Sequence, residues 1–367
     1  MMHPFGSHGP TYYYAVNARG ASHVAQNKPC QDSFAVRFVR DGEIVVAAVA
    51  DGVGSAAASE AGSMCAAQAA VQHCAKFIAD NGEHIGVNDV LQCMKEAFRQ
   101  AMQAVERHCR RDPNHELRDF DTTLCLAVYG NSRLYWGQSG DSGLIAAFND
   151  GTYELLTRQQ RDAAGRVYPL RFGERFWEFG AATKAACSFM LATDGVLENV
   201  FAPPILAKNW HTPLDRSQAH KFLRAWPHDE EHAEELQRQA DAFFLNRANS
   251  CDLVDDRTAL VVHDSRAQPL SQPAEYYEPP DWKLVAERRN AKLRQGLASA
   301  APQTAPAAHV AHRTLVVRSA PSFVRPRHAR TYVDLRIIAG QYTPKTRNDV
   351  RAARMMDSHV PRCINRR

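Results

Sequence analysis

The chain has no long apolar run. Its longest, residues 44–50, is far too short to cross a bilayer, and no apolar stretch follows a basic start near the N-terminus. These absences disfavour the membrane-spanning and secreted classes of protein. We therefore expect a cytoplasmic protein with no membrane partner.

Paired cysteine motifs are missing as well. The nine cysteines are an odd set without a Cys-x-x-Cys pair, which argues against a disulfide framework or a zinc site. Several occupy apolar positions of predicted helices or strands (Cys65, Cys74, Cys93 and Cys125). We expect these thiols to be reduced and to lie in a hydrophobic core.

The small net charge of +4 hides an uneven distribution. Residues 1–264 carry 25 basic and 33 acidic residues, whereas residues 265–367 carry 19 basic and 7 acidic ones. Prolines mark a linker after His263, a basic helix is predicted over residues 282–297, and an Ala/Pro stretch and an Arg-rich end follow. We expect one large domain over 1–264 and a basic, largely disordered extension over 265–367. Nothing in this extension matches a nucleic-acid-binding module, so nucleic acid is an unlikely partner.

Two acidic residues lie at opposite ends of one predicted hairpin. Asp32 precedes the strand that leads to the Asp41-Gly42 turn, and Asp51 follows the strand that returns from it. A two-residue turn there pairs residues whose numbers sum to 83, which places Asp32 opposite Asp51. Two facing carboxylates repel each other. The pattern is best explained by a cation between them, because hard divalent ions prefer carboxylate, carbonyl and water oxygens.

Other aspartates also fall where predicted strands end. Asp194-Gly195 ends the apolar run 188–193, and Asp255-Asp256 leads into the run 258–262. An Asn131-Ser132 turn brings Gly140-Asp141-Ser142 beside Asp121-Thr122 by the same register argument. An Asp-Gly pair is common in turns, and Asp41-Gly42 and Asp150-Gly151 are interpreted as such. Asp51 and Asp194 differ because each ends an apolar run that would be buried, where a charge needs a partner.

These residues resemble, in order, the motifs of the metal-dependent, type 2C serine/threonine protein phosphatases, most of all the bacterial branch. The similarity covers residues 12–264, and six motifs in order form a far stronger signal than any one of them. The motifs are Cys30-Gln31-Asp32-Ser33, Ala50-Asp51-Gly52-Val53-Gly54, Asp121-Thr122-Thr123, Gly140-Asp141-Ser142, Ala192-Thr193-Asp194-Gly195-Val196 and Asp255-Asp256-Arg257-Thr258.

The hydrophobic periodicity predicts helices over 55–79, 90–105, 213–226 and 230–245. Antiparallel hairpins and paired helices indicate helices packed on sheets, an α+β fold. The resemblance implies a four-layer αββα sandwich of two antiparallel sheets flanked by helix pairs, with the metal site at one end of the sheets.

The resemblance also implies a reaction, the hydrolysis of a phosphate monoester by two divalent cations, Mn²⁺ or Mg²⁺, that activate a bridging water. In that scheme Asp51 bridges both ions, the Gly52 carbonyl and waters held by Asp32 complete one, and Asp194 with Asp255 holds the other. Asp32, Asp51, Asp194 and Asp255 are therefore the expected catalytic residues. Asp141 would hold a third, weaker ion with Asp194. Glu198 matches a further acidic position of the family, although an acid at a helix start is an equally fair interpretation, and Asp256 is expected to support its loop.

The chain departs from the best-known pattern of the family in two places. Val53 stands where many members carry a histidine thought to protonate the leaving group, and Asn27 stands where an arginine commonly binds the substrate phosphate. His23, Arg19 or Lys28 could replace that arginine. A segment over residues 157–188, rich in arginines and aromatics, occupies the place of the family's flap beside the active site, and arginine suits phosphate recognition.

Three functional classes stay open. The leading one is a phosphoprotein phosphatase, a monomer, whose substrate is the target of a Ser/Thr kinase or the kinase itself. The second is a catalytically weak regulatory module of the same fold that binds a phosphoprotein; Val53 and Asn27 keep it open. The third and least favoured is a nucleic-acid-associated protein directed by its basic tail.

Overall fold

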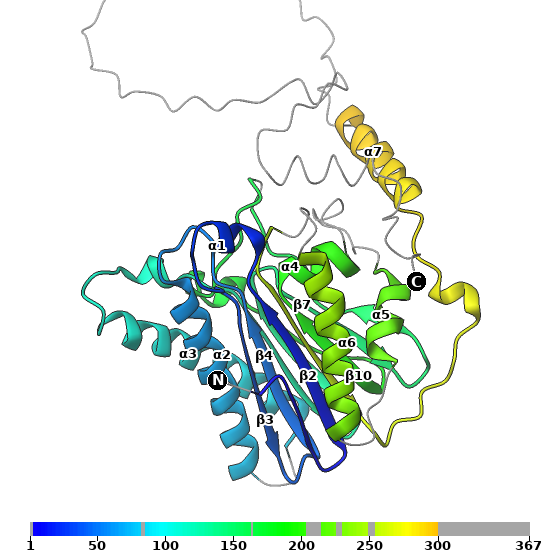
Figure 1. Ribbon diagram of the computed structural model, residues 1–367, viewed down its shortest axis with the longest axis horizontal. Helices are drawn as coiled ribbons and strands as arrows, with labels where there is room; N and C mark the ends of the chain where they lie inside the picture. Colours follow the sequence, from blue (N-terminus) through cyan, green and yellow to red (C-terminus); the bar gives the residue numbers. More distant parts are fainter. Residues whose placement is uncertain are drawn as a thin grey trace, which may run out of the picture. The chain divides into compact units, whose positions relative to one another are not determined.

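The computed structural model describes residues 3–81, 85–162, 164–202, 214–224, 230–248 and 254–299 (Figure 1). Two compact units divide the chain at Asp281 and Trp282. The first contains two antiparallel sheets. One has six strands in the order β1 (Phe5–His8), β2 (Thr11–Ala18), β11 (Arg257–Asp264), β10 (Ala186–Ala192), β7 (Gly143–Phe148) and β8 (Tyr153–Leu155). The other has five strands in the order β3 (Ser33–Val39), β4 (Ile44–Ala50), β5 (Leu124–Gly130), β6 (Arg133–Ser139) and β9 (Glu178–Ala181).

The predicted turn at Asp41-Gly42 sets the register of the first long hairpin. Both residues have positive φ, +50° and +81°, and the Glu43 N–H donates to the Arg40 carbonyl at 3.0 Å. This is the two-residue turn that suits the right-handed twist of adjoining strands. Ser33 pairs with Ala50, so the predicted sum of 83 is confirmed and Asp32 and Asp51 follow at the same end of the hairpin.

The turns of the next two hairpins also lie where the sequence predicts them. Asn131 and Ser132 have φ of +50° and +59°, and Leu124 pairs with Ser139 across β5 and β6. The third hairpin turns at residues 149–151, between β7 and β8. In each case the residues at the turn tolerate the backbone that a tight hairpin requires.

The helices form the two outer layers (Figure 1). Helices α2 (Ser59–Asp80) and α3 (Val87–Cys109) pack on the five-stranded sheet, and α5 (Arg216–Leu223) and α6 (Glu230–Ala248) pack on the six-stranded one. The four-layer αββα sandwich is thereby confirmed. The predicted start of α2 at residue 55 is early because residues 56–58 instead bond to the loops at Val53 and Asp119. Residues 213 and 225–226 of the third predicted helix lie outside the described part.

Both faces of the central strands are buried, which explains their unbroken apolar runs. In β4, Val45, Ala47 and Val49 face the space between the sheets, and the alternate residues face α2 and α3. In β10, Phe189 and Leu191 face the other sheet, while Met190 faces the α5 and α6 layer. Strands that are covered on two sides lose the polar alternation that marks a half-exposed strand.

Three strands carry no prediction from the sequence. The edge strand β1 and its neighbour β2 precede the first motif, and β9 lies in the Arg-rich segment after residue 157. Strand β2 is rich in aromatics and pairs with β11, more than 200 residues away, so that Val261 lies opposite Tyr14. No local turn joins these two strands, so no short stretch of sequence indicates that they pair.

The first compact unit extends beyond the predicted domain end at residue 264. Residues 265–281 cross the β7–β8 hairpin, where the Leu270 N–H donates to the Asn149 carbonyl at 2.8 Å. Tyr276 accepts a hydrogen bond from the Tyr153 N–H at 2.9 Å. This segment therefore packs on the six-stranded sheet.

The second unit begins with a helix, α7 (Trp282–Ser299), where the sequence predicts a basic one. In the part of the chain that the structure describes, no helix has the length and apolar character needed to cross a bilayer.

We expect a chain ending at Asp264 to fold but to be less stable than one ending at Asp281. The shorter chain loses two half-buried tyrosines, Tyr276 and Tyr277, and the hydrogen bonds to the β7–β8 hairpin. The loss should lower the free energy of unfolding by about 2–4 kcal/mol. Urea unfolding of both chains measures it, and equal midpoints would show that the segment contributes nothing to stability.

Candidate metal centre

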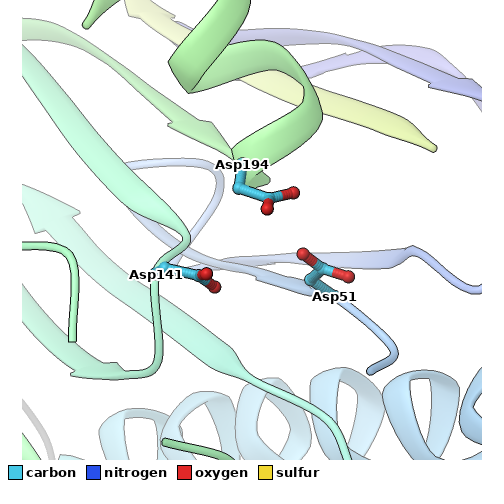
Figure 2. Close-up of side chains that lie close together, drawn as sticks. All are labelled: Asp51, Asp141 and Asp194. Atoms are coloured by element: carbon cyan, nitrogen blue, oxygen red, sulfur yellow. The ribbon is translucent and has the colours of Figure 1, made fainter. Parts of the chain in front are cut away.

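Three carboxylates from three different strand ends meet at one end of the two sheets (Figure 2). Asp51 follows β4, Asp141 lies in the loop between β6 and β7, and Asp194 begins the short helix α4 (Asp194–Val196) directly after β10. One oxygen of each lies within 4.8 Å of the others. Two oxygen ligands of one divalent ion lie at most about 4–5 Å apart, because each is about 2.0–2.6 Å from the metal. The three side chains therefore fit a shared hard cation.

The backbone of Asp51 is held by the neighbouring strand. The Thr123 N–H donates to the Asp51 carbonyl at 2.8 Å, and the Asp51 N–H donates to Thr123 Oγ1 at 3.0 Å. The same Thr123 hydroxyl lies 3.0 Å from Ser142 Oγ, beside Asp141. The loops that carry Asp51 and Asp141 are thus linked through one threonine.

Gly52 allows a close approach of two chain segments. A Cβ at this position would lie 2.6 Å from the Gln31 carbonyl oxygen and 2.8 Å from Ser59 Oγ. The Gly52 N–H donates to that same carbonyl at 3.1 Å. Any larger residue would push apart the two strand ends that carry Asp32 and Asp51, so a glycine is required on steric grounds.

Asp32 belongs to the same group of acids but is more deeply buried, at 5% exposure. Its Oδ2 accepts a hydrogen bond from Thr193 Oγ1 at 2.7 Å. Thr193 directly precedes Asp194, so this bond joins the two sheets at the site. Burial, with the nearby charge of Asp256, raises the pKa of Asp32 despite that bond.

Burial raises the pKa of Asp51 too, and the charges of Asp194, Asp32, Asp141 and Asp255 raise it further. The effect of Asp255 shows that its charge reaches the centre, although it is exposed and does not join the group of three. Several carboxylates that raise one another's pKa repel each other when ionised. A divalent cation would relieve this repulsion.

The adjacent Asp256 has a different environment. Its two carboxylate oxygens accept hydrogen bonds from the Gly20 N–H at 2.6 Å and the Gln31 N–H at 2.5 Å. His23 Nδ1 lies 2.8 Å from the second of these oxygens. A buried carboxylate with these partners fixes the loop before β3.

The three residues proposed to bind phosphate lie in this loop region. His23 is buried against Asp256, with its side chain at 8% exposure. Arg19 is exposed and donates from Nη1 to the Lys28 carbonyl at 3.0 Å. Lys28 is half-buried. Asn27, at the position where the family's arginine is expected, is exposed and has a φ of +54°. Of the three candidates, Arg19 has the most exposed cationic side chain.

Arg161 is one of the arginines of the 157–188 segment, for which the sequence suggested phosphate recognition and not a contact with the acidic residues. Its guanidinium bonds to Asp141 through Nε at 2.6 Å and to Asp194 through Nη2 at 2.9 Å. The same Nη2 lies 2.8 Å from Glu198 Oε1, which brings Glu198 to the edge of the centre. Nothing in the sequence distinguishes Arg161 from the other arginines of its segment, because the contact depends on the path of the flap across the site.

A comparison with protein families matches residues 19–241 to the family described as Protein phosphatase 2C. No curated protein sequence matches the chain. Distant similarity extends to solved structures of bacterial phosphatases and related proteins. The catalytic domain of the serine threonine protein phosphatase PstP, in complex with two manganese ions, is 20% identical with a TM-score of 0.45, over 69% of this chain and 97% of that one.

Two further structures are similar at lower identity. The serine/threonine phosphatase Stp1 from Staphylococcus aureus is 10% identical with a TM-score of 0.44, over 72% of this chain and 98% of its own. RsbX in complex with magnesium is 14% identical with a TM-score of 0.41, over 71% of this chain and 99% of its own.

We expect Asp51→Asn to stabilise the protein in the presence of EDTA, increasingly so as the pH rises. A carboxyl whose pKa is raised in the folded state binds its proton more tightly there, so stability falls as pH rises above about 4, the ordinary pKa of aspartate. Asparagine does not titrate and escapes this loss. From pH 4 to pH 7, the free energy of unfolding of the mutant should rise by about 1 kcal/mol relative to that of the wild type, as measured by urea unfolding.

The control for this measurement is Asp41→Asn, which changes a fully exposed aspartate in the β3–β4 turn. Asp41 lies at the far end of the hairpin, 3.8 Å from His8 Nε2 and away from the carboxylates of the centre. The difference in unfolding free energy between Asp41→Asn and the wild type should therefore change less with pH than it does for Asp51→Asn. A pH-independent difference for Asp51→Asn would contradict the electrostatic account of the centre.

Proposed function

Because the chain belongs to the protein phosphatase 2C family, we propose that it hydrolyses phosphoserine and phosphothreonine in proteins with two divalent cations, Mn²⁺ or Mg²⁺. The observation that carries this proposal is the meeting of Asp51, Asp141 and Asp194 at one end of the sandwich (Figure 2). The residues come from three separate motifs, and carboxylate oxygens are the ligands that these ions prefer.

In this proposal Asp51, Asp194 and Asp255 would hold the two cations together with the Gly52 carbonyl and waters bound to Asp32. The cations would supply an activated water for the attack on phosphorus and would offset the charge of the departing oxygen. The placement of Asp51 next to Asp194, and the charge of Asp255 at the same centre, support these roles.

The chain's own residues supply orientation. Thr193 fixes one oxygen of Asp32 by a 2.7 Å hydrogen bond, which leaves the other oxygen to hold water. Thr122 and Thr123 fix the backbone of Asp51, the Thr122 hydroxyl donating to its carbonyl at 3.0 Å. We assign Arg19 to the substrate phosphate, since its guanidinium is exposed and is carried by the loop that Asp256 fixes. Val53 cannot transfer a proton, so the leaving hydroxyl takes its proton from water in this scheme.

The substrate is a phosphoprotein made by a Ser/Thr kinase, or the kinase itself. A second candidate function is a regulatory module that binds a phosphoprotein with slow turnover. The contact of Arg161 with Asp194 favours it, because a guanidinium competes with a metal ion for the same carboxylate. The two candidates differ in the rate at which the protein hydrolyses a phosphate ester, and a single turnover assay measures this rate.

We expect hydrolysis of an aryl phosphate and of a phosphothreonine peptide to require Mn²⁺ or Mg²⁺ and to stop in chelator. Asp51→Asn and Asp194→Asn should each lower kcat/KM by more than about 100-fold, since even the outer partners of metal ligands contribute about 10–100-fold. The assay is steady-state turnover over a metal titration.

Asp41→Asn is the control, and it should turn over at the wild-type rate because the residue lies in a turn and is fully exposed. Activity that persists in chelator, or in both site mutants, would refute the two-metal mechanism. Metal binding with a slow rate in every substrate tested would favour the regulatory module.

A further inference from the structure

The flap places one arginine inside the acidic centre. The side chain of Arg161 is 18% exposed, and those of Asp141, Glu198 and Asp194 are 5%, 13% and 19% exposed. Its contacts with these three carboxylates lie between 2.5 and 2.9 Å, distances typical of charge-assisted hydrogen bonds. An arginine guanidinium stays protonated in proteins, and here three carboxylates surround it. Arg161 is therefore a fixed positive charge.

The backbone of the flap holds Arg161 in this position. The preceding residue, Gln160, pairs with Gly140 in both directions: its N–H donates to the Gly140 carbonyl at 3.1 Å, and its Oε1 accepts from the Gly140 N–H at 2.8 Å. Arg161 itself forms a bridge to Val167 across the flap hairpin. The loop that carries Asp141 is thus bonded directly to the segment that carries Arg161. These backbone bonds hold the guanidinium near the carboxylates.

The carboxylates of the centre differ in their partners. Asp141, Asp194 and Glu198 contact Arg161, whereas Asp32 accepts a hydrogen bond from Thr193. Asp141 and Asp194 are shared, because each contacts Arg161 and also belongs to the group with Asp51. A metal ion at Asp141 would have to displace an arginine that is bonded to three carboxylates at once.

We propose that Arg161 is the resident cation of the Asp141, Asp194 and Glu198 end of the centre, so that metal ions are confined to the Asp51 end. This inference rests on the proposed function. Arg161 is a positioning residue: it neutralises Asp141 and Glu198, orients Asp194 toward Asp51 and ties the flap to the site. Asp141 then serves as the partner of the arginine, and the chain uses a guanidinium where the sequence predicts a third, weaker metal.

The test counts the Mn²⁺ ions bound by the full chain, from the electron paramagnetic resonance signal of free Mn²⁺ during a titration. Arg161→Met keeps the length of the side chain and removes its charge, so this variant should bind one more Mn²⁺ than the wild type. Arg161→Lys keeps the charge and should bind the wild-type number. In EDTA, Arg161→Met should melt at a lower temperature than the wild type. Added Mn²⁺ should raise the melting temperature of this variant by more than it raises that of the wild type.

Arg171→Met is the matched control. Arg171 also ties the flap to a sheet, through a two-bond ion pair with Asp121 at 2.6 and 2.8 Å, but Asp121 lies outside the group of three. This variant should also melt earlier yet bind the wild-type number of ions. Equal Mn²⁺ numbers for the wild type and Arg161→Met would overturn the inference. If the wild type binds no more Mn²⁺ ions than Asp51→Asn does, the proposed function is overturned instead.

A second measurement uses the wild-type protein, so it works even if the Arg161→Met variant does not fold. In the NMR spectrum of the full chain, the Arg161 Nε–H, assigned by its loss in Arg161→Lys, should exchange slowly with water because it is bonded to Asp141. Slow exchange should persist when Mg²⁺ saturates the protein. Release of this proton by Mg²⁺ would show that metal displaces the arginine, and the inference would fail.

Discussion

Repulsion among carboxylates gathered at one end of the sandwich is the constraint on which the site depends. The charges of Asp194, Asp32 and Asp141 raise the pKa of Asp51, and these side chains would move apart if their loops were free. The three hydrophobic layers oppose this, because β4 and β10 are buried on both faces and cannot shift without exposing apolar side chains. The fold holds the acids together, and a cation then gains from binding them.

Short hydrogen bonds convert that general confinement into a defined geometry. The bond from Thr193 to Asp32 crosses from one sheet to the other, and the Thr123 hydroxyl connects the Asp51 backbone to the loop of Asp141. Thr193 lies next to Asp194 in sequence, so a small change at this strand end would move both residues. Asp256 supports the scaffold in a different way, because it accepts hydrogen bonds from the Gly20 and Gln31 N–H groups at the two ends of the loop that follows Arg19.

The flap is anchored at two points with different consequences. Arg171 binds Asp121 near the start of β5, and the Trp177 indole donates to the Leu170 carbonyl at 3.1 Å, so this part is held by packing and one ion pair. Arg161 instead contacts Asp141, Asp194 and Glu198 of the acidic centre. The position of this part of the flap therefore depends on the charges of the centre, whereas the Arg171 anchor depends on Asp121.

The sequence by itself determined the features that depend on local backbone chemistry. The turns at Asp41-Gly42 and Asn131-Ser132 require positive φ, and because a two-residue turn fixes which residues pair, the hairpin registers could be predicted. Those registers placed Asp32 opposite Asp51 and Asp141 beside Asp121. The four-layer sandwich and the place of Asp194 in the centre were implied by the resemblance of the motifs to a known family. The tertiary structure alone decided the pairing of β2 with β11, the burial of His23 against Asp256 and the entry of Arg161 into the acidic centre. These depend on contacts between residues far apart in the chain, for which no local residue pattern distinguishes one histidine or one arginine from another.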